Sequence, residues 1–205
     1  EYLKASGDLA VKLYKEDIEA AMRTKDFGGF QLLSICDYTG QSTALVGVLD
    51  IFFESKGVIS GEEFRHFCGP VVPLLRAKRM YLAGETMELG LDLYDYGKER
   101  IERPEFVLQI LDGDKLFYET RTTEQKVLVK LPETRKPSML RVTLSVGTYQ
   151  NEWRIFVYPA EPGIAEAAGN PAVTAAHGRE ELEQALEQAQ AAGGGRILML
   201  AGCVN

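Results

Sequence analysis

The chain contains one short segment, residues 30–36, that is apolar on both faces of any strand it forms. Its sequence is FQLLSIC, and it lies between Gly28-Gly29 and a polar loop that leads into the apolar run 43–55. This order of turn, strand, loop and helix is typical of a parallel β-sheet with helices on its faces. A parallel strand needs neighbouring strands, and nothing before residue 30 supplies one. We therefore expect residues 30–36 to belong to a larger parallel sheet whose other strands are not in this sequence.

Residues 1–69 are predicted to be the terminal segment of a TIM-type β/α barrel, with its last strand and helices. Apolar residues at helical spacing predict an amphipathic helix over 8–25. A second helix is predicted over 43–55. Residues 60–63 (SGEE) match a capping box, in which a serine hydroxyl and a glutamate carboxylate each accept a backbone N–H. A short helix is therefore predicted to begin there.

Residues 70–159 change to a period of two, which is typical of half-buried strands. The seven strands are predicted over 80–82, 87–94, 106–111, 116–120, 126–131, 140–146 and 153–158. The sequence Asp112-Gly113-Asp114-Lys115 predicts a tight hairpin turn. Short strands with frequent turns and no helices indicate an immunoglobulin-like β-sandwich. The match is to the architecture alone, because the Cys–Trp–Cys pattern of antibody domains is absent.

Residues 160–205 begin with a linker rich in Pro, Ala and Gly. A helix is predicted over 179–192 and a strand over 196–200. We interpret this region as the linker and start of a further α/β or sandwich domain, cut off at its end. The predicted fold class is therefore α+β and multidomain, with a barrel remnant, an all-β sandwich and a truncated α/β tail.

Composition excludes several classes of function. The net charge is −7 and the cationic residues are scattered, which argues against a nucleic-acid partner. The longest cationic run, 76–79, is interpreted as the solvated start of a strand. Cys36, Cys68 and Cys203 are far apart and odd in number, so we predict no disulfide framework and no metal site. No apolar run is long enough for a membrane span, and no cofactor is predicted.

No catalytic residue is assigned to this chain. The carboxylates lie mostly on predicted helix faces and at strand ends, where solvation is their ordinary role. His66 and His177 have no nucleophile at a recognisable spacing. Trp153 and Tyr149 would form an aromatic sugar platform if exposed, but packing within the sandwich or its hairpin is the favoured interpretation.

The candidate binding residues are Asp37, Tyr38 and Gln41, which follow the predicted strand 30–36. Active sites of β/α barrels lie at the carboxyl ends of the strands. These side chains offer hydrogen bonds to sugar hydroxyls, and the tyrosine ring offers a stacking face. The alternative is that Asp37 and Gln41 cap the following helix and fix the loop.

Residues 29–68 carry a resemblance to a known family. The segments GFQLLSICDYTGQSTALVGVLD, SKG, EEFR and FC resemble the end of the barrel in the bacterial multidomain glycosidases of glycoside hydrolase family two, the β-galactosidase- and β-glucuronidase-like enzymes. The resemblance covers residues 20–75 well, and the sandwich by position and pattern. It implies a parent whose catalytic glutamates lie on earlier barrel strands, outside this chain. It also implies that Asp37, Tyr38 and Gln41 border the sugar pocket, although Ser42 replaces an expected glycine.

The resulting hypothesis is a non-catalytic C-terminal portion of a glycoside hydrolase that acts on β-linked glycosides in carbohydrate metabolism. It would complete the barrel wall and support it. The expected partners are the rest of the parent barrel, a carbohydrate substrate through the parent, and a second copy through the barrel remnant. For the parent we expect a periplasmic or extracellular location. The alternative is a stand-alone β-sandwich module that binds carbohydrate or protein.

Overall fold

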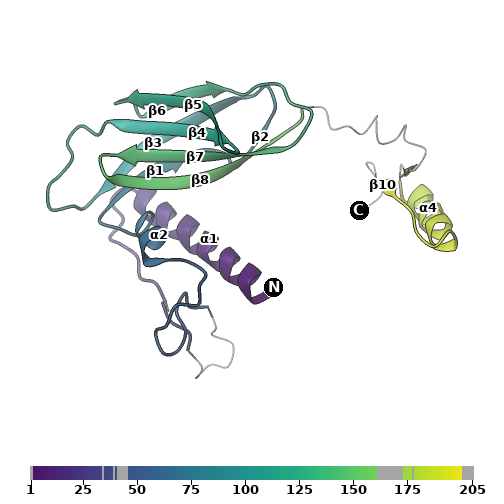
Figure 1. The fold of residues 1–205 in the computed structure, drawn as a ribbon, viewed down its shortest axis with the longest axis horizontal. Helices are drawn as coiled ribbons and strands as arrows, with labels where there is room; N and C mark the ends of the chain where they lie inside the picture. The colour runs from purple at the N-terminus through teal and green to yellow at the C-terminus, as the bar shows by residue number, and fades with distance from the viewer. Residues whose placement is uncertain are drawn as a thin grey trace. The chain divides into compact units, whose positions relative to one another are not determined.

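The computed structural model describes residues 2–33, 35–38, 40, 46–160, 173–176 and 178–199. The elements are α1 (Tyr2–Arg23), α2 (Gly61–Arg65), β1 (Val71–Arg76), β2 (Met80–Leu82), β3 (Thr86–Asp95), β4 (Phe106–Asp112), β5 (Lys115–Thr122), β6 (Lys126–Lys130), β7 (Ser138–Val146), β8 (Tyr149–Tyr158), β9 (Thr174–Ala176), α4 (Arg179–Ala191) and β10 (Ile197–Met199) (Figure 1). The chain divides into two compact units. The first holds 1–81, 86–130 and 139–156, and therefore α1, α2 and most of the strands of β1–β8.

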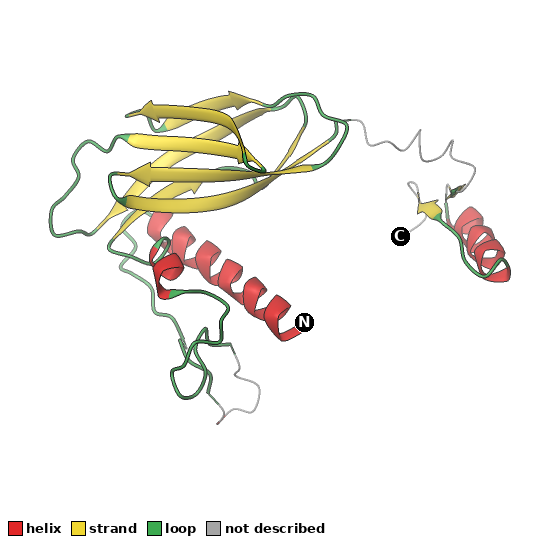
Figure 2. Ribbon diagram, in the orientation of Figure 1, coloured by secondary structure: helices red, strands yellow, loops and turns green. Residues whose placement is uncertain are grey.

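Strands β1–β8 form two sheets of a β-sandwich, as the period-two pattern predicts, and the pairs β1–β3, β3–β6, β4–β5 and β4–β7 are antiparallel. One sheet has the order β1-β3-β6 and the other β2-β8-β7-β4-β5 (Figure 2). Alternate side chains of β3, β4 and β8 are buried between the layers. The hairpin predicted at Asp112–Lys115 is present, with Gly113 at a φ of +59°. The β-sandwich part of the predicted fold class is confirmed.

Strand β1 was not predicted, and its residues show why. Its first five residues, VVPLL, are all buried, so the strand has no polar face and no period of two. Pro73 also argues against a central strand. The structure accommodates Pro73 because β1 lies at the edge of its sheet. The Pro73 carbonyl accepts a hydrogen bond from Asn151 Nδ2 at 3.0 Å.

Helix α1 is attached to the sandwich through Glu19, a carboxylate with no solvent exposure. Glu19 Oε2 accepts hydrogen bonds from Trp153 Nε1 at 2.9 Å and from Arg23 Nη1 at 3.0 Å. Glu19 Oε1 accepts one from Asn151 Nδ2 at 2.9 Å and one from Lys15 Nζ. We call these five side chains the Glu19 cluster. The cluster joins α1 to β8, and in Figure 1 the C-terminal end of α1 meets the sandwich on the side of β1 and β8.

The electrostatics of the Glu19 cluster are those of a compensated buried ion pair. Burial alone would raise the pKa of the Glu19 carboxyl, but the Lys15 ammonium and hydrogen bonds from Lys15, Trp153 and Asn151 outweigh it and lower that pKa. Burial lowers the pKa of Lys15, with the Glu19 charge opposing the shift. The Lys15 ammonium also lies over the Trp153 ring, 4.8 Å from its centre.

The strand predicted over 30–36 is wrong for the described residues. Residues 27–33 and 35 have no strand structure, and Cys36 makes a single parallel bridge to Leu49. The segment belongs to neither sheet of the sandwich and is not a helix. A strand that is apolar on both faces needs partners on both sides, and among the described residues the predicted strand has no pairing beyond the isolated bridge of Cys36 to Leu49. A barrel remnant is therefore not seen in the part of the chain that is described.

The helix predicted over 43–55 is also wrong where the structure describes it, since residues 41–45 lie outside the described residues. Residues 46–55 form a tight loop closed by a bridge between Leu49 and Ser55. The Asp50 carboxylate accepts hydrogen bonds from the amides of Phe52 and Glu54 at 2.8 and 2.9 Å. An aspartate that bonds these amides replaces the helical pattern by a turn, and Phe53 adopts a φ of +64°.

The predicted short helix after Ser60 is confirmed as α2, including the reciprocal capping box between Ser60 and Glu63. The helix predicted over 8–25 is present as α1. The tail forms α4 and β10 near the predicted ranges, and β10 pairs in parallel with β9, which was not predicted. The division into 1–69, 70–159 and 160–205 stays a prediction.

Two further predictions concern cysteines and membranes. Cys36 and Cys68 are free and half-buried, whereas Cys203 lies outside the described residues. Within the described ranges, no helix has the length and apolar character needed to cross a membrane.

Candidate functional site

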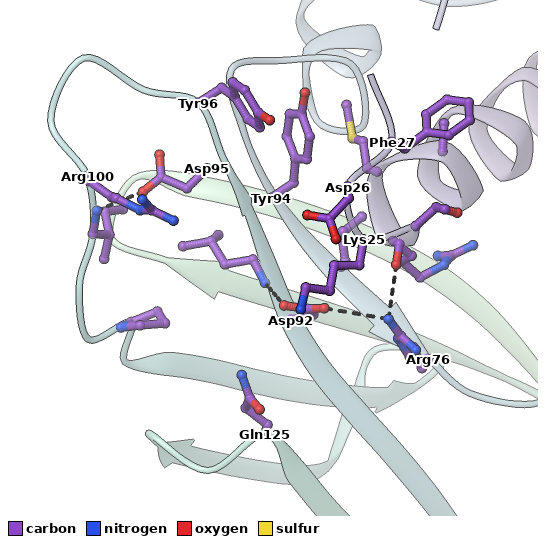
Figure 3. Close-up of a pocket in the computed structure, with 18 of the residues that line it drawn as sticks. Lys25, Asp26, Phe27, Arg76, Asp92, Tyr94, Asp95, Tyr96, Arg100 and Gln125 are labelled. Atoms are coloured by element: carbon purple, nitrogen blue, oxygen red, sulfur yellow. Dashed lines mark hydrogen bonds and ion pairs between the residues drawn. The ribbon is translucent and has the colours of Figure 1, made fainter. Parts of the chain in front are cut away.

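An open pocket of about 580 Å³ lies at the C-terminal end of α1 (Figure 3). The first unit forms it: the end of α1 with the turn to residue 27, residues of β1 and β3, and the loop 95–104 that follows β3. Phe106 of β4 and Gln125 before β6 complete the lining. We call it the α1-end pocket. Its lining is mainly polar and charged, unlike the core of the sandwich behind it.

The floor of the pocket is built by the pairing of β1 with β3. Arg76 lies opposite Gly90, and Leu74 lies opposite Asp92. A Cβ at Gly90 would lie only 3.1 Å from the Arg76 Cβ, so the glycine gives the arginine room to cross β3. Arg76 Nη2 then lies 3.8 Å from Asp92 Oδ2 and donates a hydrogen bond to the Arg23 carbonyl at 3.2 Å.

The loop after β3 is organised by Asp95. Its Oδ1 accepts a hydrogen bond from the Gly97 amide at 2.9 Å, and its Oδ2 accepts one from the Ile101 amide at 2.7 Å. These two bonds, with the nearby charge of Arg100, lower the pKa of the Asp95 carboxyl. Asp95 therefore fixes the loop and is not the group that the pocket offers to a ligand.

Two tyrosines form the aromatic part of the pocket. The rings of Tyr94 and Tyr96 stack with their centres 4.9 Å apart and their planes at 23° (Figure 3). Tyr94 is half-buried, and Tyr96 is 74% exposed. The outer ring is thus supported from behind and open to solvent in front, which is the arrangement needed for a flat stacking surface.

The third wall is the turn that ends α1. The Thr24 hydroxyl donates a hydrogen bond to the Ala20 carbonyl at 2.8 Å. Asp26 has a φ of +59°, a left-handed conformation that aspartate tolerates better than most residues. This turn places Lys25 and Asp26 on the rim of the pocket (Figure 3).

Charged and polar side chains make up most of the lining of the pocket. Cations and carboxylates are interleaved around it, namely Arg23, Lys25, Arg76 and Arg100 with Asp26, Asp92, Asp95 and Glu102. No histidine or cysteine lines it. Among the described residues there is also no group of three or more His, Cys, Asp or Glu side chains that could hold a metal ion. The pocket offers hydrogen-bond donors, hydrogen-bond acceptors and an aromatic face.

The predicted binding residues lie elsewhere. Asp37 is nearly buried, and its Oδ1 accepts hydrogen bonds from the Gly47 amide at 2.9 Å and from Lys56 Nζ at 3.0 Å. A Cβ at Gly47 would lie 2.4 Å from the Cys36 carbonyl carbon, so the chain crosses itself closely here. Tyr38 is exposed, and Gln41 lies outside the described residues. Their proposed contact with sugar stays a prediction.

Asp37→Ala is expected to loosen this loop and leave the sandwich intact. The change leaves the Lys56 ammonium and the Gly47 amide without their shared acceptor, a loss of about 1 to 3 kcal/mol confined to the loop. Hydrogen exchange should show faster exchange over residues 46–56 and unchanged protection of β3 and β4. Glu54→Gln, an exposed charge change in the same loop, is the control. Equal exchange in Asp37→Ala and the unaltered protein would contradict this role.

The other candidates from the sequence have structural positions. Trp153 is buried in the Glu19 cluster, so the packing interpretation is confirmed for it, while Tyr149 is exposed. Tyr149, His66 and Cys68 line a second open pocket of about 510 Å³. Burial raises the pKa of the Cys68 thiol, which lowers its thiolate fraction and argues against a nucleophile. His177 lies outside the described residues.

Sequence reasoning did not find the α1-end pocket. One local signal was present: Asp92, Tyr94 and Tyr96 recur at every second residue around the end of a predicted strand. The other half of the pocket depends on contacts between segments far apart in sequence, such as Arg76 with Arg23. The sequence pattern indicates for Arg76 only a place in a solvated cationic run.

Comparison with known proteins gives limited similarity. No protein-family model matches the chain, and no curated protein sequence matches it. Solved structures with partial similarity include the superoxide reductase (neelaredoxin) from Ignicoccus hospitalis, at 14% identity and a TM-score of 0.29, covering 42% of this chain and 79% of that chain. The fibronectin(III)-like modules of Clostridium thermocellum CbhA match at 12% identity and a TM-score of 0.29, covering 43% and 94%.

A conjugative transposon lipoprotein from Bacteroides eggerthii matches at 10% identity and a TM-score of 0.29, covering 42% of this chain and 96% of that chain. TM-scores of this size carry no argument about function. The two candidate sites, Asp37 with its loop and the α1-end pocket, are therefore interpreted from their own geometry.

Proposed function

We propose that this chain is the non-catalytic accessory portion of a glycoside hydrolase that acts on β-linked glycosides. In this proposal residues 27–57 pack against the β/α barrel that carries the catalytic glutamates. The β-sandwich supports that contact through α1 and α2. No catalytic residue is placed in this chain, and Asp37, Tyr38 and Gln41 border the sugar pocket of the assembled enzyme.

The observation that carries the proposal is the exposure of apolar side chains in one stretch of sequence. The exposed large apolar residues between positions 27 and 53 are Phe27, Phe30, Leu33, Ile35, Tyr38, Val46, Ile51, Phe52 and Phe53. Leu33 is 88% and Phe52 75% exposed. Apolar exposure concentrated in this way marks an interaction surface. The packed sandwich shows that the chain can bury such side chains where it has partners for them.

The backbone of the same stretch supports a barrel as the partner. This stretch holds one isolated parallel bridge, Cys36 to Leu49, and one isolated antiparallel bridge, Leu49 to Ser55. The parallel bridge is of the pairing type found in β/α barrels. A segment that resembles the last strand of such a barrel, and lacks its neighbours, is expected to stay irregular until it meets them. The ion pair of Asp37 with Lys56 holds this segment together in their absence.

Complementation of a truncated barrel tests the proposal. The barrel of a family-two-type β-glycosidase, truncated before its last strand, is mixed with this chain, and hydrolysis of p-nitrophenyl β-D-galactoside and β-D-glucuronide is measured. Neither part alone should hydrolyse them, whereas the mixture should. Leu33→Asp combined with Phe52→Asp should abolish the activity of the mixture, because charge is then placed in the proposed interface. Leu116→Asp, a change at an exposed residue of β5, is the control and should not.

Two outcomes would contradict the proposal. One is turnover by this chain alone, and the other is an inactive mixture. Sedimentation velocity separates a further case: a dimer of this chain that dissociates in the Leu33→Asp, Phe52→Asp variant would mean that the apolar stretch pairs two copies, and the barrel proposal would fail.

A further inference from the structure

The α1-end pocket has the features of a ligand site that the proposed function does not use. Residues of β1 and β3 form part of it, and no residue of the apolar stretch beyond Phe27 lines it. Its volume of about 580 Å³ falls within the range of about 300 to 1,000 Å³ found for small-molecule sites. Its walls are fixed by the Glu19 cluster on one side and by Asp95 on the other.

The charges of the pocket favour a neutral, polar ligand. Its four cations and four carboxylates are balanced in number, so neither an anion nor a cation meets a field of one sign. Several of these groups are already committed to protein contacts: Arg23 to Glu19, and Asp95 to two backbone amides. Lys25, Asp26 and Arg100 remain at the rim with charges of both signs (Figure 3).

The pair Arg76 and Asp92 provides donors and acceptors side by side. Arg76 makes its contacts with Asp92 and with the Arg23 carbonyl through Nη2, and among the described residues Nε and Nη1 have no hydrogen-bond partner. Asp92 Oδ1 accepts a hydrogen bond from the Leu93 amide at 2.8 Å, while Asp92 Oδ2 lies 3.8 Å from Arg76 Nη2. A hydroxyl group both donates and accepts, so it can bridge a carboxylate oxygen and a guanidinium nitrogen that are too far apart to bond well directly.

The stacked rings of Tyr94 and Tyr96 add a flat apolar surface to the same pocket, farther along β3 from Asp92 and Arg76 (Figure 3). A ligand that satisfies both parts has several hydroxyls on its edge and a face of C–H bonds. We propose that the α1-end pocket is a binding site for a saccharide of two or more rings, in which one ring packs against Tyr96 and hydroxyls of another bridge Arg76 and Asp92. The site is separate from the one that Asp37, Tyr38 and Gln41 would border.

Titration with neutral disaccharides tests this site directly. Lactose, cellobiose and maltose are added to the ¹⁵N-labelled protein, and backbone amide shifts are followed by NMR, with saturation transfer reporting which sugar protons meet the protein. We expect at least one disaccharide to bind with a dissociation constant on the order of 1 mM and to shift the amides of Gly97, Ile101 and Gln125. Glycerol, which has hydroxyls but no ring face, should shift none of them.

Two variants link the binding to the named side chains. Tyr96→Ala should raise the dissociation constant of the best disaccharide about tenfold or more. Because Tyr96 is highly exposed, its removal should leave the protein folded. Asp92→Asn should raise that dissociation constant as well, while leaving amide shifts elsewhere unchanged. Tyr149→Ala, which removes an exposed tyrosine outside the α1-end pocket, is the matched control and should bind as the unaltered protein does.

The proposal is overturned if none of the three disaccharides shifts the amides of the pocket at 50-fold the expected dissociation constant. It is also overturned if the pocket responds only to sodium glucuronate or inorganic phosphate, because an anion would then be the ligand. These outcomes leave the barrel complementation untouched, since that experiment depends on Leu33 and Phe52. Failure of one proposal is therefore distinguishable from failure of the other.

Discussion

Glu19→Ala is expected to lower the free energy of unfolding by about 3 kcal/mol, although Glu19 belongs to α1 and not to a strand of the sandwich. The change leaves the Lys15 ammonium without its buried counterion and removes the acceptor of Trp153 Nε1 and Asn151 Nδ2. Removing one partner of a buried pair costs about 3 to 5 kcal/mol. The lower end applies because the Lys15 and Arg23 side chains keep some contact with water. Urea unfolding followed by the fluorescence of Trp153, the single tryptophan of the chain, measures the loss and reports from inside the cluster.

The control for Glu19→Ala is Glu16→Ala, one turn earlier on α1. Glu16 pairs with Arg79 at the surface, and exposed pairs contribute less than about 1 kcal/mol. The stabilisation by Glu19 also depends on pH. Because the pKa of Glu19 is lowered in the folded state, its stabilisation is fully present above the unfolded value of 4.5 and is lost as the pH falls through the folded pKa. Equal losses in both variants at neutral pH would mean that Glu19 does not hold α1.

The sandwich could be predicted from the sequence because its information is local. Residues such as Met87, Leu89 and Leu91 alternate with polar neighbours, and each of the three is buried. Turn residues add a second local signal, as Asp112 and Gly113 do. Period and turn together set the register of a strand, so the strand positions followed without knowledge of their partners.

Residues 30–55 mark the limit of the same reasoning. A run that is apolar on both faces predicts a strand only if neighbours exist, and the sequence of the run itself does not contain them. Asp50 shows a second limit. Its carboxylate binds the amides of Phe52 and Glu54, and this turn competes with a helix that apolar spacing alone favoured. In both cases the apolar pattern was present in the sequence. The contacts that decide between strand, helix and turn were not contained in that pattern.

The α1-end pocket was not predictable because it depends on tertiary contacts between segments far apart in the sequence. Its position depends on the end of α1 lying over β1 and β3, and that placement follows from the bond between Glu19 and Trp153, which are 134 residues apart in sequence. Trp153 had been considered only with its neighbour Tyr149. Glu19 lies on a helix whose sequence is amphipathic, and the residues around Glu19 do not indicate that Trp153 will donate a hydrogen bond to it.

Ile155→Ala is expected to cost about 3 kcal/mol of unfolding free energy, whereas Phe156→Ala, one residue later on β8, should cost about 1 kcal/mol or less. Ile155 has no exposure and lies between the sheets, so its loss leaves a cavity. Phe156 loses more atoms but is 40% exposed on the outward face. The order of the two effects thus depends on the face of the strand and not on side-chain size.

Urea unfolding of the two variants, followed by the same tryptophan signal, tests the register of β8 directly. A shift of one residue would place Phe156 between the sheets and Ile155 outside, and the larger loss would then belong to Phe156→Ala. That reversal would also move Trp153 out of reach of Glu19, because both features depend on the same alternation along β8. The comparison of Ile155→Ala with Phe156→Ala therefore also tests the attachment of α1 to β8, and with it the wall of the α1-end pocket.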